Sequence, residues 1–201
     1  QSVQAGHRGL VAQPRYPVPT TVEVTVEGGL HSPPMQAATP SPPPTPIGPE
    51  QAALMARRVS VIVGSRDAAL RPHVMRAVGC RLSADRRRVT VLLTHAGSAQ
   101  VLADLAANGR IAVVFSEPSS HRTLQVKGVD AAIAPAGAED AALVRRYQQE
   151  FADEIGQLGF AAEVAQTMLR HDDDLVAVSF TPCEAFDQTP GPQAGQPLAA
   201  C

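Results

Sequence analysis

The sequence has few aromatic residues, few cysteines, no long apolar run and no strong excess of either charge. Its net charge of −2 argues against a general nucleic-acid-binding protein, because such proteins carry a marked basic excess. No apolar run reaches about 18 residues, so no transmembrane helix is predicted. The N-terminus also lacks the basic-then-apolar pattern of a signal peptide. We therefore expect a cytoplasmic protein with no nucleic-acid or membrane partner.

The scarcity of cysteine and aromatic residues limits the kinds of site that the chain can build. Cys80, Cys183 and Cys201 are odd in number and widely spaced, which fits neither a disulfide framework nor a zinc site. No two histidines stand at a metal-binding spacing such as His-x-x-x-His, so no metal site is predicted. Aromatic residues make up 3% of the chain and tryptophan is absent, so backbone and aliphatic groups would hold a cofactor more than ring stacking would.

Proline marks one part of the chain as different from the rest. Residues 1–50 contain eleven of the 18 prolines and almost no periodic apolar pattern, so they cannot offset the entropy of ordering by burial. We expect residues 1–49 to be a disordered leader, with Met35 as a candidate for the natural start. A folded domain is expected over residues 50–187 and a flexible tail over residues 188–201.

The remaining sequence alternates β-branched runs with a few helical segments. Short polar turns separate the first three apolar runs, and these turns are too short for the crossover that a parallel sheet needs. The pattern therefore predicts a mainly β protein with some α-helix, a small antiparallel barrel with helices packed outside. We expect strands at residues 59–63, 73–82, 88–93, 111–115, 122–133 and 175–180, helices at 51–57, 98–107, 138–155 and 161–169, and no regular structure from residue 182 onward.

One stretch, residues 71–128, has the residue types needed to hold a phosphate. Arg76 and Arg81 lie in a strand-like run, and a guanidinium group matches two phosphate oxygens at once. In a regular strand they would point to opposite faces, so a bulge near Gly79 would be needed to bring both to one site, and without such a bulge only one of the two arginines reaches it. The helix expected to begin near Ser98 would add free N–H groups and the positive end of its dipole.

Four segments in this order resemble the pyridoxamine 5′-phosphate oxidase-like family of FMN-binding split barrels. They are residues 72–76 with Arg81, the pair Leu93-Thr94 with residues 98–100, residues 108–113, and residues 122–128. The resemblance extends over roughly residues 50–180 and implies a split antiparallel β-barrel with flanking helices. It also implies a homodimer with flavin at the interface between the subunits.

The resemblance further implies flavin mononucleotide (FMN) as cofactor and hydride transfer between the flavin and a small substrate, with a reduced nicotinamide nucleotide as a candidate. It assigns no catalytic side chain. The chain departs from the family at Gln100, where a lysine is usual, and it has no tryptophan, so oxidation of vitamin B6 is not expected. A non-catalytic flavin- or haem-binding protein of the same fold and a deazaflavin-dependent reductase stay open as alternatives. The cofactor-binding residues implied are Arg76, Ala77, Val78, Arg81, Leu93, Thr94, Ser98, Gln100, Arg122 and Thr123.

Overall fold

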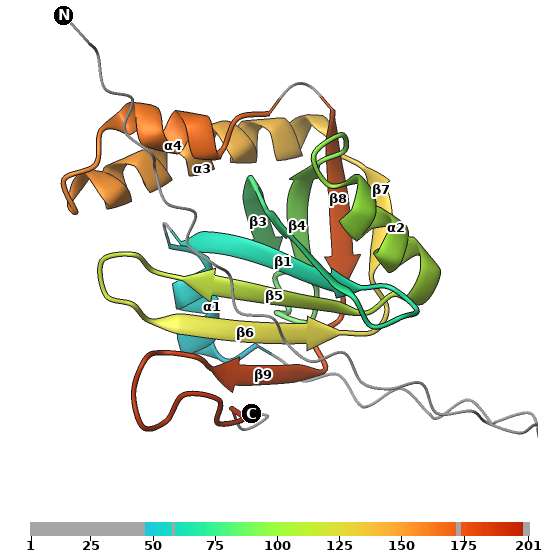
Figure 1. Cartoon of the computed structure of the whole chain (residues 1–201). Helices are drawn as coiled ribbons and strands as arrows, with labels where there is room; N and C mark the ends of the chain where they lie inside the picture. The colour runs from blue at the N-terminus through green and yellow to red at the C-terminus, as the bar shows by residue number, and fades with distance from the viewer. Residues whose placement is uncertain (1–46, 58, 172–173, 199–201) are drawn as a thin grey trace, which may run out of the picture. The chain divides into compact units, whose positions relative to one another are not determined.

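The computed structural model describes residues 47–57, 59–171 and 174–198, and the expected leader with Met35 lies outside these residues except at its end. Within the described part the chain forms nine strands and four helices, so the protein is mainly β (Figure 1). The elements are α1 (Pro49–Met55), β1 (Ser60–Arg66), β2 (Pro72–Arg76), β3 (Gly79–Leu82), β4 (Val89–Thr94), α2 (Ala99–Asn108), β5 (Ile111–Ser116), β6 (Thr123–Gly128), β7 (Ala132–Pro135), α3 (Ala138–Gly156), α4 (Ala162–Met168), β8 (Leu175–Phe180) and β9 (Glu184–Asp187).

The strands form two antiparallel sheets. The first sheet has the strand order β2-β1-β5-β6-β9, and the second has the order β3-β4-β8-β7. Alternate residues of β1, β5 and β6 are buried, as expected for strands that have one face on a core. This arrangement confirms the predicted fold class, an antiparallel split barrel with helices outside. The core between the sheets includes Val61, Val63, Val113, Phe115 and Val126 from the first sheet and Val89, Val91, Leu93, Val178 and Phe180 from the second.

The chain passes from the first sheet to the second directly after β2. The single strand predicted over residues 73–82 is therefore wrong, since β2 and β3 belong to different sheets. The two residues that connect β2 to β3, Ala77 and Val78, are buried, and the backbone N–H of each donates a hydrogen bond to a different sheet. The N–H of Ala77 donates to the carbonyl of Val61 at 2.9 Å, and the N–H of Val78 donates to that of Leu92 at 2.8 Å. Their backbone is fixed from both sides.

A second passage between the sheets follows Gly128, so the single strand predicted over residues 122–133 is also two strands, β6 and β7. Gly128 is needed there because the chain comes very close to β8. A Cβ atom at this position would lie 2.5 Å from Cδ2 of Phe180 and 3.0 Å from the carbonyl oxygen of Thr181. Gly128 therefore permits the bend at which the chain changes sheet.

Two further expectations were wrong at the ends of strands. The first strand was expected to end at residue 63, but β1 continues to Arg66 and pairs there with Pro72. Regular structure was expected to end at residue 182, but β9 follows and extends the first sheet, with Phe186 opposite Gln125 on β6. β9 has four residues, and its place in the sheet depends on β6, a partner about 60 residues earlier in the chain.

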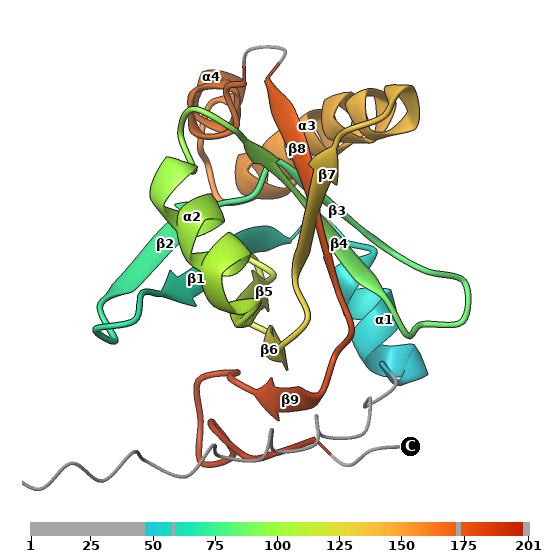
Figure 2. The same ribbon diagram turned by 90° about the vertical axis from the view of Figure 1, so that its right-hand side faces the viewer.

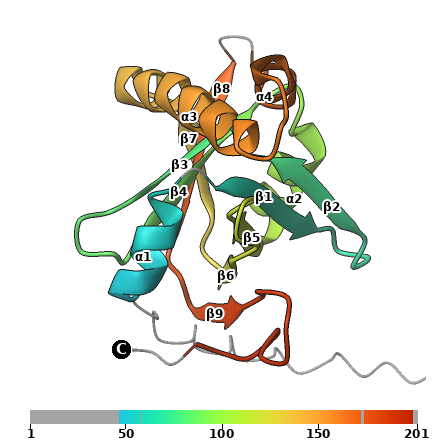
Figure 3. The same ribbon diagram turned by 90° about the vertical axis from the view of Figure 1, so that its left-hand side faces the viewer.

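The helices lie at three places around the sheets. Helix α2 confirms its prediction, with Ser98 at its start and Gly109 in the left-handed conformation at its end. It contacts β1 and β2 of the first sheet and β7 of the second (Figure 2). Helices α3 and α4 pack together on one side, whereas α1 lies beside β3 (Figure 3). No helix in the described ranges is long and apolar enough to cross a membrane.

Candidate functional site

A row of polar side chains crosses the outer face of the first sheet at one end. The Nη1 group of Arg76 donates a hydrogen bond to Oγ of Ser60 at 2.6 Å. Ser60 is the register partner of Ser116 on β5, and Oγ of Ser116 lies 2.8 Å from Oγ1 of Thr123 on β6. Four strand ends therefore bring one guanidinium group and three hydroxyl groups together. We call Arg76, Ser60, Ser116 and Thr123 the hydroxyl row.

Strand alternation explains why this row faces outward. In β1 the side chains of Val61 and Val63 are fully buried in the core, so their neighbour Ser60 must point to the opposite face. Arg76 is half-buried there, and among the described residues no carboxylate forms an ion pair with it. A guanidinium group that has lost part of its water without gaining a counter-charge is an unfavourable arrangement, which a bound anion would relieve.

The other two predicted arginines differ from Arg76 because each has a carboxylate partner. The Nε group of Arg81 lies 2.9 Å from Oδ1 of Asp140 at the start of α3. The Nη2 group of Arg122 lies 3.0 Å from Oε1 of Glu50 on α1. Arg76 and Arg81 also lie on strands of different sheets, so the change of sheet sets their relative orientation. The bulge suggested near Gly79 is therefore not needed to explain how the two side chains are directed.

The carboxylate of Asp140 gives a pH-dependent contribution to stability. Burial alone would raise the pKa of Asp140, but the hydrogen bond from the N–H of Gly137 and the contact with the Arg81 guanidinium outweigh burial and lower it. Because the folded-state pKa is lowered, the stabilisation is present above the ordinary pKa of about 4 and is lost as the pH falls below it. We expect Asp140→Asn to reduce the free energy of unfolding by about 1 kcal/mol at neutral pH.

Urea unfolding of wild type and Asp140→Asn at neutral pH and near pH 3 measures this effect. The difference between the two proteins should shrink at the acidic pH, where the wild-type carboxyl becomes protonated. A difference of the same size at both values would show that the charge of Asp140 does not stabilise the fold.

A second group of predicted residues lies at the start of α2. Ser98 is 1% exposed, and its hydroxyl group has no hydrogen-bond partner in the described part of the chain. The nearby turn at Gly97 lies against Met75, since a Cβ atom on Gly97 would lie 3.0 Å from Cε of Met75. Met75 packs on the core, so it lies on the opposite face of β2 from Arg76. The start of α2 and the hydroxyl row are therefore on opposite faces of β2.

The ten sequence-predicted residues thus occupy several places. The structure brings Arg76 and Thr123 together in the hydroxyl row, and it groups Thr94, Ser98 and Gln100 around the start of α2. Leu93 is fully buried in the core. Ala77 and Val78 form the buried passage between the sheets, and Arg81 and Arg122 lie in ion pairs with helices. Ser60 and Ser116 could not be predicted from the sequence, since single serines at strand ends have no recognisable pattern.

Sequence reasoning also missed a buried carboxylate on α2. Asp104 is 3% exposed, and its Oδ2 atom lies 2.7 Å from both Oγ of Ser65 and Nδ1 of His73. Gln100 reaches the other oxygen, with 3.4 Å between Nε2 and Oδ1. Burial would raise the pKa of Asp104, but these three hydrogen bonds lower it overall, so the carboxylate stays charged.

The Asp104 cluster joins α2 to the first two strands. The hydroxyl of Ser65 donates to the carboxylate and is not bonded to His73, so the three residues do not form the Ser–His–Asp relay of a hydrolase. Cys80 is not an activated nucleophile either, because burial raises the pKa of its thiol to about 12. Within the described ranges no group of His, Cys, Asp and Glu side chains could hold a metal ion.

No family model matches the sequence, and no curated protein is similar to it at the sequence level. Solved structures are similar to it at low identity. HupZ of Group A Streptococcus is 18% identical, with 74% of this chain and 99% of that chain covered and a TM-score of 0.46. HutZ, the haem storage protein of Vibrio cholerae, is 18% identical, with 71% and 94% covered and a TM-score of 0.42.

A pyridoxamine 5′-phosphate oxidase-related, FMN-binding protein of Nostoc punctiforme is 11% identical, with 71% of this chain and 83% of that chain covered and a TM-score of 0.41. The similar structures include the family that the sequence resembles. All three TM-scores are below 0.5, so the fold class rests on the sheet topology of the chain itself.

Proposed function

We propose that the chain binds flavin mononucleotide through its phosphate at the hydroxyl row and acts as an oxidoreductase. The observation that carries this proposal is the half-buried Arg76, which has no described carboxylate partner and donates a hydrogen bond to the hydroxyl of Ser60. A guanidinium group can donate two parallel hydrogen bonds to a phosphate, and the hydroxyl of Ser60 keeps its own hydrogen for a further one. The hydroxyl of Thr123 already donates to the carbonyl of His121, so the hydroxyl of Ser116 donates to Thr123. This donor set fits a phosphate dianion.

The chain's residues would position the cofactor in two ways. Ser60 stands on β1 next to the strand that carries Arg76, so the sheet fixes this hydroxyl and the guanidinium group relative to each other for the phosphate oxygens. Ala77 and Val78, bonded to one sheet each, fix the backbone that follows Arg76 and limit its movement. When bound, a flavin supplies hydride chemistry, and the protein contributes orientation and electrostatics.

The proposal includes a hydride donor and a second copy of the chain. A reduced nicotinamide nucleotide is the donor we propose. The hairpin formed by β1 and β2 exposes 66% of Leu70 and 70% of Val74, and Val74 lies on the same face of β2 as Arg76. Contact with a second chain would cover this apolar surface next to the hydroxyl row, which favours a homodimer.

Titration of the full chain with flavin mononucleotide, followed by quenching of flavin fluorescence, tests the binding step. One flavin per chain is expected, on a particle that sediments as two chains. Anaerobic addition of a reduced nicotinamide nucleotide should then remove the visible absorbance of the bound flavin. Binding without reduction would indicate a flavin-binding protein that is not an oxidoreductase, and the absence of saturable binding would overturn the proposal.

A further inference from the structure

A cavity of about 370 Å³ lies between α1, β3 and α3, and none of the hydroxyl-row residues lines it. Its volume is at the small end of the range for ligand pockets, roughly 300–1,000 Å³. Among the strands that the structure describes, β3 is at the edge of the second sheet, and none of them pairs with its outer side. The residues that line the cavity are Ala52, Met55, Ala56, Arg57, Cys80, Arg81, Leu82, Ser83, Leu143, Arg146, Tyr147 and Glu150.

One part of the lining is apolar and uncharged. Met55, Leu82 and Leu143 contribute aliphatic side chains. Burial raises the pKa of both Cys80 and Tyr147, so the thiol and the phenol are neutral at physiological pH. The Tyr147 hydroxyl already donates to a backbone carbonyl at 2.5 Å, which leaves its ring as an apolar wall. This side of the cavity is suited to the aromatic or aliphatic part of a ligand.

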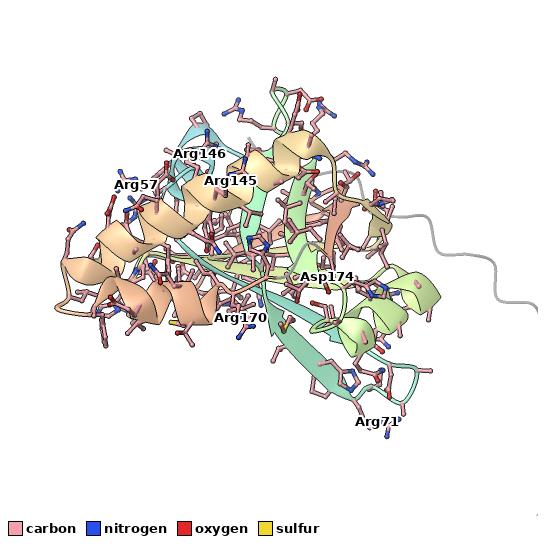
Figure 4. The ribbon with its side chains drawn as sticks, turned by 90° about the horizontal axis from the view of Figure 1, so that it is seen from above. Arg57, Arg71, Arg145, Arg146, Arg170 and Asp174 are labelled. Atoms are coloured by element: carbon pink, nitrogen blue, oxygen red, sulfur yellow. The ribbon has the colours of Figure 1, made fainter. Side chains whose placement is uncertain are left out.

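The other part of the lining is an arginine rim, formed by Arg57, Arg81 and Arg146. Figure 4 shows Arg57 and Arg146 on the side of the molecule where α1 and α3 lie. Arg81 uses Nε to contact Asp140, and Arg146 has its Nε 3.8 Å from Glu150, so these two ion pairs leave the terminal Nη groups of both arginines available. These terminal groups are the ones that bind an acidic group through paired hydrogen bonds. Arg57 differs, because its Nη1 lies 3.1 Å from Oε1 of Glu117.

The charge on the lining is positive overall. Glu150 is the one carboxylate among the described residues that line the cavity, against three guanidinium groups. Glu117 and Asp140, the carboxylates paired with Arg57 and Arg81, do not line this cavity, and Glu117 lines a neighbouring hollow together with Arg57 and Glu150. The arginine side chains are 53%, 51% and 70% exposed, so they can turn toward a ligand without a large change in the fold.

We propose that this cavity binds a small organic anion with an apolar body and one acidic head group, a carboxylate, sulfonate or phosphate. The body would lie on Leu143 and the ring of Tyr147, and the head group would meet the arginine rim. This site is additional to the proposed flavin function, since none of the hydroxyl-row residues lines the cavity. The family resemblance implied that Arg81 binds the cofactor, whereas this proposal assigns Arg81 to the organic anion in the cavity.

The test uses anilinonaphthalene sulfonate, a fluorescent anion of this class, with the full chain. We expect saturable binding of one probe per chain, and Arg146→Ala should weaken it roughly tenfold through the loss of a charge-assisted contact. Arg145→Ala is the matched control, because Arg145 is an exposed neighbour on α3 that does not line the cavity. That control should bind the probe like wild type.

Two further measurements separate this site from unspecific binding and from the flavin. N-phenylnaphthylamine, which has the same aromatic body without the sulfonate, should bind at least tenfold more weakly. Arg76→Ala should leave probe binding unchanged, whether or not flavin binds the chain. Equal binding of the neutral probe, equal losses in the Arg145 and Arg146 variants, or no saturable binding would each overturn the proposal.

Discussion

Arg76→Ala is expected to lower the affinity for flavin mononucleotide by roughly 10- to 150-fold, because a hydrogen bond to a charged group contributes about 1.5–3 kcal/mol. The side chain's described polar contact within the protein is the hydrogen bond to Ser60, so its removal leaves no buried carboxylate without a partner. The fold should therefore persist in the variant. Fluorescence quenching of flavin by wild type and variant measures the two dissociation constants.

The control for this variant is Arg71→Ala, on the same hairpin. Arg71 precedes β2 at the tip of the β1–β2 hairpin, is 77% exposed and pairs with Asp67 (Figure 4). Its loss removes the same charge from the protein without touching the hydroxyl row, so flavin affinity should change little. If the two variants bind flavin equally well, Arg76 does not contact the phosphate.

Gly109→Ala is expected to reduce the free energy of unfolding by about 2–5 kcal/mol. Gly109 ends α2 with φ of 64°, in the left-handed region where an L-residue costs about 1–2 kcal/mol. A Cβ atom there would also lie 2.7 Å from the carbonyl oxygen of Val129, and such overpacking adds about 1–3 kcal/mol. The carbonyl of Gly109 accepts a hydrogen bond from Ala131, so the two segments cannot separate freely. Urea unfolding measures the change.

Gly159→Ala provides the comparison for Gly109→Ala. Gly159 also has a positive φ, 85°, but nothing lies within 4 Å of the position of its Cβ atom. Its replacement should cost only the backbone strain, about 1–2 kcal/mol. Equal losses of stability in the two variants would show that the close approach of residue 129 to Gly109 has no energetic effect.

The sequence predicted those parts of the fold that depend on local pattern. The alternating run at β4 and the helix α2, with Ser98 before it and Gly109 after it, appear at the expected positions. The changes of sheet after Arg76 and Gly128 were missed, because a strand that leaves one sheet and enters another keeps its apolar character along the chain. What changes is the partner strand, and a single sequence does not show which strand that is.

The same limit applies to the candidate site. Arginines in strand-like runs could be recognised, and the structure separates them by their partners, since Arg81 faces Asp140 and Arg76 faces Ser60. Asp104 and His73 are 31 residues apart and meet only because α2 packs on β2. Hydroxyl groups from three strands were brought into one row by register, and register depends on the whole sheet.

The most direct measurement of the central claim, that Arg76 holds a flavin phosphate, compares flavin mononucleotide with riboflavin, which lacks the phosphate. Wild type should bind flavin mononucleotide more tightly than riboflavin by roughly 10-fold or more, and Arg76→Ala should remove most of that preference. Riboflavin itself should bind wild type and variant about equally. A preference for flavin mononucleotide that is the same in both proteins would contradict the claim.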